Sequence, residues 1–277
     1  MPARPDSLRT RYLAWLYSPP SQRPVVKALC ALESEIAESL RPGLDHHVAH
    51  TRLQWWREEC ERCAQGRPLH PLTRELVSAC ASGASPLAGL SGLVDTAVWD
   101  LAAVTFETRR ELTAYGERWA AAVIEPTATH ALAALPPSAH RWRALGAALR
   151  EIEMLRELAP EARAGRLRVP LDELQQAGID PADLTRPPWR AALSALLRQR
   201  HEALRASVAE CLGSLTAEEQ RQLRGVLVWA ALAWQQSWRT QRALPNQVRA
   251  PRYHTLTDGW HAWRAARRAI TGAYRLT

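Results

Sequence analysis

The chain has 277 residues, and its 36 lysines and arginines outnumber its 28 acidic residues, which gives a formal net charge of +8. This length can bury one large core, and the abundance of alanine, leucine and arginine favours helices throughout. The longest apolar stretch, Val226–Trp234, is about half the length that crosses a bilayer, and Met1–Thr10 lacks the apolar core of a signal peptide. We therefore expect a cytoplasmic protein whose charge attracts anionic lipids or acidic partners.

Proline and glycine residues divide the chain into helical segments. We expect helices near residues 6–17, 22–41, 45–65, 70–82, 90–104, 107–124, 126–135, 138–158, 171–177, 187–213, 216–243 and 253–274. Thr216 and Glu219 form a capping box that marks one helix start. No repeat or shift of composition marks a second domain, so residues 1–277 are expected to form a single all-α domain.

Two clusters of candidate metal ligands precede residue 65. Asp45, His46, His47 and His50 lie together, with two of the histidines at helical spacing, but no distant third ligand is recognisable. Cys60 and Cys63 form a lone C-x-x-C inside a predicted helix, whereas a redox pair would sit at a helix start and a zinc site would need a second pair. The two cysteines are interpreted as ordinary half-buried thiols, no metal is expected at the histidines, and the five cysteines indicate no disulfide framework.

The segment 146–179 carries the pattern most suggestive of chemistry. Glu157 and Glu161 lie four residues apart, and Arg163 and Arg166 follow at once. Acid pairs beside arginines suit a diphosphate bridged by magnesium, although a solvated, salt-bridged helix end has the same pattern. Pro160 lies between the two glutamates and disfavours helix at the residue before it, so we expect the helix to stop or kink by that point.

The order of residues in this segment resembles the second aspartate-rich motif of squalene and phytoene synthases, N-I-L-R-D-x-x-x-D-x-x-x-G-R-x-x-x-P. Glu157 and Glu161 stand where that family has its two aspartates. Other motif positions are filled by Leu155, Arg156, Gly165, Arg166 and Pro170. Many bacterial relatives also share the R-L-x-W-W-R-E-E segment of Arg52–Glu59 and a G-x-P-x-H-P tail, here Gly66, Pro68, His70 and Pro71. A third likeness is VRAPR at 248–252, and the resemblance extends from about residue 25 to the C-terminus.

The resemblance implies the all-α isoprenoid synthase fold, with helices around a central cavity and two acidic motifs that grip magnesium ions. The first motif of the family is usually Asp-Asp-x-x-Asp, but residues 25–39 contain no aspartate, and the best register places Ala37 and Glu38 at its first two positions. Tyr115–Pro126 also lacks the glycines of the family's A-G-x-V-G run. The candidate remnants of the metal site are Glu35, Glu38, Glu157 and Glu161, and the candidate diphosphate-binding residues are Arg52, Arg156, Arg163 and Arg166.

Two hypotheses follow from these departures. The first is a protein with a degenerate site that binds an isoprenoid, another lipid or a protein partner, as the resemblance to the complex I assembly factor branch implies. The second is an active prenyltransferase that joins two isoprenoid diphosphates, with Glu33 and the candidate glutamates as unusual magnesium ligands. Without catalysis, no metal or other cofactor is expected. The missing aspartates favour the first hypothesis.

Aromatic residues give the last clue. Tryptophans fall within predicted helices at 55, 56, 99, 119, 142, 229, 234 and 238, where they suit either core packing or an aromatic-lined isoprenoid cavity. The C-terminal helix combines rings and positive charge at Trp260, Trp263, Arg264, Arg267, Arg268 and Tyr274. This pattern suits either core packing or peripheral contact with the inner face of a membrane. No nucleic-acid-binding motif accompanies the charge, so no nucleic acid is expected.

Overall fold

The computed structural model describes residues 5–41, 43–80, 87–132, 139–247 and 255–276. Within these ranges the regular structure is entirely helical, which confirms the predicted all-α class. The α-helices are α1 (Pro5–Tyr17), α2 (Arg23–Ala37), α3 (His46–Ala64), α4 (Pro71–Ala79), α5 (Ser91–Leu101), α6 (Arg109–Ala131), α7 (Ala139–Arg156), α8 (Leu158–Arg163), α9 (Leu171–Gln176), α10 (Ala191–Gly213), α11 (Ala217–Gln222), α12 (Arg224–Ala243) and α13 (Thr255–Ile270). Short 3-10 turns occupy Pro20–Gln22, Glu38–Leu40 and Pro181–Thr185. The VRAPR segment lies outside the described residues.

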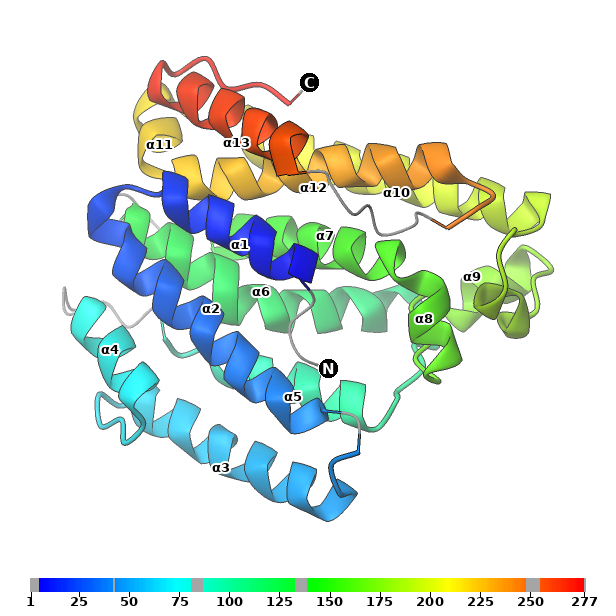
Figure 1. Cartoon of the computed structure of the whole chain (residues 1–277), viewed down its shortest axis with the longest axis horizontal. Coiled ribbons are helices and arrows are strands. Elements are labelled where there is room, and N and C mark those ends of the chain that lie inside the picture. The colour runs from blue at the N-terminus through cyan, green and yellow to red at the C-terminus, as the bar shows by residue number, and fades with distance from the viewer. Residues whose placement is uncertain (1–4, 42, 81–86, 133–138, 248–254, 277) are drawn as a thin grey trace.

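Helices α6 and α7 run side by side through the middle of the molecule (Figure 1). Small residues bring them together, because a Cβ on Gly116 would lie 2.9 Å from Ala147 Cβ, and one on Gly146 would collide with Ala120. Helices α10 and α12 lie on one side of this pair, and α2 and α5 on the other (Figure 1). Helix α1 packs against α12 and α13, so the first and last described helices are neighbours.

The Arg52–Glu59 segment and its G-x-P-x-H-P tail build a turn between α3 and α4. Glu59 is fully buried and accepts backbone N–H bonds from His70 and the residue before it, both at 2.8 Å, and a hydroxyl bond from Thr73. Gly66 has φ +73°, a conformation that favours glycine. The two tryptophans of the segment pack edge-on against the His70 ring. This motif therefore stabilises the α3–α4 turn.

Helix boundaries agree with expectation at one proline and differ at two other points. A break was expected before Pro126, but α6 continues through it; the proline is buried, and packing against α7 outweighs its missing N–H bond. The stop before Pro160 is confirmed, since α7 ends at Arg156 and α8 begins at Leu158. Pro160 lies in the first turn of α8, where a backbone N–H would lack a helical acceptor anyway. The single helix expected at 216–243 is divided at Leu223.

None of the described helices combines the length and the hydropathy needed to cross a membrane.

Candidate functional site

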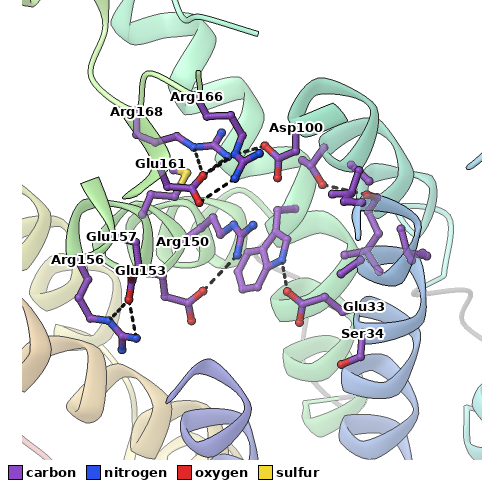
Figure 2. Close-up of a pocket in the computed structure, with 18 of the residues that line it drawn as sticks. Glu33, Ser34, Asp100, Arg150, Glu153, Arg156, Glu157, Glu161, Arg166 and Arg168 are labelled. Atoms are coloured by element: carbon purple, nitrogen blue, oxygen red, sulfur yellow. Dashed lines mark hydrogen bonds and ion pairs between the residues drawn. The ribbon is translucent and has the colours of Figure 1, made fainter. Parts of the chain in front are cut away.

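A pocket of about 190 Å³ opens between α1, α2, α5, α6, α7, α8 and α12 (Figure 2). Among the described residues its charged lining consists of five arginines and five carboxylates, so their formal charges cancel. The arginines are Arg11, Arg150, Arg156, Arg166 and Arg168, and the acids are Glu33, Asp100, Glu153, Glu157 and Glu161. The pocket therefore concentrates ionised groups without carrying a net charge.

Arg11, from α1, binds the acid that α2 contributes. Its Nε and Nη2 donate to the two oxygens of Glu33 at 2.7 and 2.8 Å, and its Nη1 donates to Glu153 at 3.2 Å. The guanidinium lies over the ring of Trp229, 4.9 Å from its centroid, and Trp119 Nε1 donates to Glu33 at 2.9 Å. Burial alone would raise the pKa of Glu33, but the charge and hydrogen bonds of Arg11 hold it below its ordinary value. Glu33 is therefore ionised at neutral pH.

A second group of ion pairs surrounds α8 and the loop that follows it. Arg166 Nε and Arg168 Nη2 both donate to Glu161, at 2.8 and 2.9 Å. Arg168 Nη2 also donates to Asp100 at 2.7 Å, and the Tyr115 hydroxyl donates to the same carboxylate at 3.1 Å. Although burial lowers the pKa of Arg168, the surrounding negative charges raise it above its usual value. These links tie α8 to α5 and α6 (Figure 2).

The remaining pocket arginines lie on α7. Arg156 Nε donates to the neighbouring Glu157 at 2.9 Å. Arg150 Nη1 donates to Glu153 at 3.3 Å and its Nη2 to the Tyr115 hydroxyl at 3.4 Å. Its Nε is buried and makes no hydrogen bond within the described part of the chain. This atom is an unused donor of the pocket.

The donor set as arranged does not fit a magnesium ion. Magnesium requires near-octahedral oxygen ligands at about 2.1 Å. Each pocket carboxylate accepts instead from at least one guanidinium, and no group of three or more His, Cys, Asp and Glu side chains among the described residues is placed to hold a metal. A dication at these oxygens would have to displace arginines from their ion pairs.

The structure brings together some of the residues singled out in the sequence and separates others. Glu157, Glu161, Arg156 and Arg166 all line the pocket. The residues outside its lining are Glu35, Glu38, Arg52 and Arg163. Glu35 and Arg163 are exposed to solvent.

Helix α2 contributes a different acid from the candidates Glu35 and Glu38. Glu33, Ala37 and Leu40 follow one another at helical spacing and line the pocket together, whereas Glu35 and Glu38 point elsewhere. Of the two residues that the sequence register placed at the metal-binding positions, Ala37 lines the pocket and Glu38 does not, and the register itself stays a prediction.

Sequence reasoning missed half of the charged lining. Arg150 and Glu153 precede Glu157 by seven and four residues, so helical spacing already placed them on its face of α7. Arg11 lies before the start of the recognised resemblance, and Asp100 belongs to none of its motifs. Only the folded chain connects those two residues to the glutamates.

The two clusters before residue 65 take other roles. Asp45 Oδ1 accepts from His47 N at 2.9 Å and caps α3. His46 and His50 place their Nε2 atoms 3.2 Å apart on the exposed first turns of that helix. Cys60 and Cys63 are free and buried, more deeply than expected, and burial raises the pKa of each thiol to about 12. Such thiols are protonated and unreactive at neutral pH.

Comparison with known proteins agrees with this fold. One similar crystal structure is that of a dehydrosqualene synthase in complex with ligand, with 16% sequence identity over 95% of this chain and 91% of that chain and a TM-score of 0.74. Another is squalene synthase HpnC from Alicyclobacillus acidocaldarius, with 18% identity over 85% and 89% of the two chains and a TM-score of 0.67. No curated protein sequence matches the chain significantly. The model of the squalene/phytoene synthase family matches residues 5–260. The chain therefore belongs to the squalene/phytoene synthase family.

Proposed function

We propose that this protein binds an isoprenoid or another lipid without magnesium and does not condense two isoprenoid diphosphates. The observation that carries the proposal is the pairing of every pocket carboxylate with an arginine. The arginine guanidinium groups occupy the space beside the acids that magnesium ions would need for metal-dependent chemistry. The site is therefore a non-catalytic form of the family's diphosphate site.

Energetics support the proposal. Breaking a buried ion pair by removing one partner costs about 3–5 kcal/mol, because the other charge stays buried without compensation. A magnesium ion that took Glu33 or Glu161 from its arginine would compensate the carboxylate, but it would leave the guanidinium without that partner and repel it.

An active prenyltransferase is the second candidate, and one observation favours it. Glu33 from α2 and Glu157 and Glu161 from the α7–α8 region line the same cavity, as a site built from two acidic motifs requires. In this alternative the arginines would leave the acids and bind the substrate diphosphates. The two candidates differ in whether the acids are needed for turnover.

The deciding experiment combines turnover and binding. Purified protein is incubated with farnesyl or geranylgeranyl diphosphate, with magnesium or with EDTA, while pyrophosphate release is measured. Tryptophan fluorescence reports binding in the same samples. We expect no pyrophosphate and equal binding with and without magnesium. Magnesium-dependent release that disappears in Glu157→Gln and Glu161→Gln would establish the prenyltransferase instead.

If the protein binds neither an isoprenoid nor another lipid, we propose that it binds a protein partner instead. The resemblance to the complex I assembly factor branch suggests a respiratory-complex assembly intermediate as that partner. This hypothesis is tested if neither isoprenoid diphosphates nor extracted lipids change the tryptophan fluorescence. Co-purification of the chain with such an intermediate would then support a protein partner, and absence of the chain from the purified intermediate would reject it.

A further inference from the structure

Helix α13 has its small residues inside and its large apolar residues outside. The face against α12 and α1 consists of Ala262, Ala265, Ala266 and Ala269, all buried. The opposite face exposes Leu256, Trp260, Trp263 and Ile270 by 85, 50, 47 and 51%. A surface helix normally turns its large apolar residues toward the core. These four residues, together with Arg264 and Arg267, whose guanidinium groups lie over the two tryptophan rings, are here called the α13 outer face.

Positive charge accompanies these rings. The Arg264 guanidinium lies 5.1 Å from the centroid of Trp260, and that of Arg267 lies 5.4 Å from the centroid of Trp263. Asp258, the one acid in the α13 sequence, is engaged by Arg239 at 2.7 Å. The outer face therefore presents tryptophans, aliphatic chains and guanidinium groups without a free carboxylate on the same helix.

We propose that the α13 outer face docks on the surface of an anionic membrane, with α13 parallel to the bilayer plane. Indoles prefer the headgroup region, where the ring leaves water and the N–H keeps a polar partner. Arginines beside them bind lipid phosphates, and the formal charge of +8 adds long-range attraction. The docking surface is independent of the pocket, because none of its residues lines that cavity.

Charge favours a membrane over a second copy of the chain. Leu256, Trp260, Trp263, Arg267 and Ile270 follow at the four-and-three spacing of a helix–helix seam. In a symmetric seam Arg267 would be buried, and the acid that α13 contains, Asp258, is already engaged by Arg239. At a membrane the same side chain reaches a phosphate while its carbons stay among the lipid chains.

The test measures co-sedimentation with vesicles of neutral phosphatidylcholine and with vesicles that also contain phosphatidylglycerol. The variant Trp260→Ala/Trp263→Ala is compared with Trp55→Ala/Leu69→Ala, which removes two exposed apolar residues near the α3–α4 turn on the opposite side of the molecule (Figure 1). Circular dichroism confirms that each variant is folded.

Charge is tested with a second matched pair. Arg264→Gln/Arg267→Gln removes two charges from the outer face, whereas Arg74→Gln/Arg190→Gln removes two exposed arginines elsewhere. Two arginines near an anionic surface correspond to a loss of roughly thirty-fold in partitioning. We expect that loss, reduced by added salt, only for the outer-face pair.

We expect the wild-type protein to bind anionic vesicles and hardly bind neutral ones, and the tryptophan pair to weaken binding by about ten-fold or more. Equal binding of the tryptophan variant and its control would overturn the proposal. Absence of wild-type binding at low ionic strength would overturn it too, as would a dimer in sedimentation equilibrium that dissociates in the tryptophan variant.

Discussion

Replacing Arg11 by methionine tests how the pocket is held together. Arg11 is 5% exposed and joins α1 to Glu33 on α2 and Glu153 on α7. Methionine fills similar space above Trp229 but leaves the two carboxylates without this guanidinium. Breaking a buried pair costs about 3–5 kcal/mol. Glu153 keeps Arg150 at 3.3 Å, whereas Glu33 keeps the indole N–H of Trp119, so we expect the lower end of that range, about 3 kcal/mol.

The pH dependence of this loss has a definite sign. In the wild type the pKa of Glu33 is held below its ordinary value of 4.5, so its contribution to stability is present above that pH and is lost as pH falls through the folded-state pKa. Without Arg11, burial dominates and raises the pKa of Glu33. Protonation then removes the uncompensated charge, so the deficit of the variant shrinks as pH falls through that raised pKa toward 4.5, and it shrinks further where the wild type loses its own contribution.

Urea denaturation followed by circular dichroism, at neutral and at mildly acidic pH, measures the free energy of unfolding of both proteins. The double variant Arg11→Met/Glu33→Gln serves as the control, because it removes the orphaned charge and recovers part of the loss. A deficit under about 1 kcal/mol at neutral pH would refute the reasoning. A deficit independent of pH, or a double variant as unstable as the single one, would do the same.

Three further predictions concern the scaffold. Gly146→Val forces a side chain into Ala120 and should destabilise the protein by about 1–3 kcal/mol in thermal unfolding, whereas Gly259→Ala, with open space around its Cβ, should be neutral or slightly stabilising. Glu59→Ala leaves two partly buried N–H groups at the α3–α4 turn without their carboxylate acceptor, so the free energy of unfolding in urea should fall by about 1–3 kcal/mol; a wild-type value would show that the turn does not need the carboxylate. Burial lowers the pKa of His201 to about 4, so between pH 6.5 and about 4 the unfolded chain binds a proton that the folded protein does not. The free energy of unfolding of the wild type should therefore decline as pH falls across that range, and that of His201→Gln should decline less. Denaturation curves taken at several pH values measure both.

The helices were largely predictable because local spacing and caps determine them. The capping box at Thr216 is present in the structure, and the helix boundary before Pro160 follows from proline geometry alone. The continuous α6 was not predictable, because the packing that carries it past Pro126 comes from α7, a separate segment of the chain. Tertiary packing overrode a local rule at that point.

The site was less accessible from sequence than the fold. Glu157 and Glu161 could be found because their spacing and neighbours form a contiguous pattern. The partner of Glu33 is 22 residues earlier in the chain, and Arg168 reaches an acid 68 residues away on α5. Ion pairs between distant segments leave no periodic signal, so the pairing of the pocket acids with arginines was visible only after folding.

Because the charges in the pocket cancel, the loss of a single charged side chain changes the kind of ligand that the pocket attracts. Loss of one carboxylate, for example Glu161, would leave Arg166 and Arg168 facing the same space and turn that side of the pocket into a receptor for phosphate. Loss of Arg11 would instead leave acids that attract cations. One exchanged side chain, with no change of backbone, thus selects between opposite ligand chemistries, which makes this scaffold a favourable starting point for redesign.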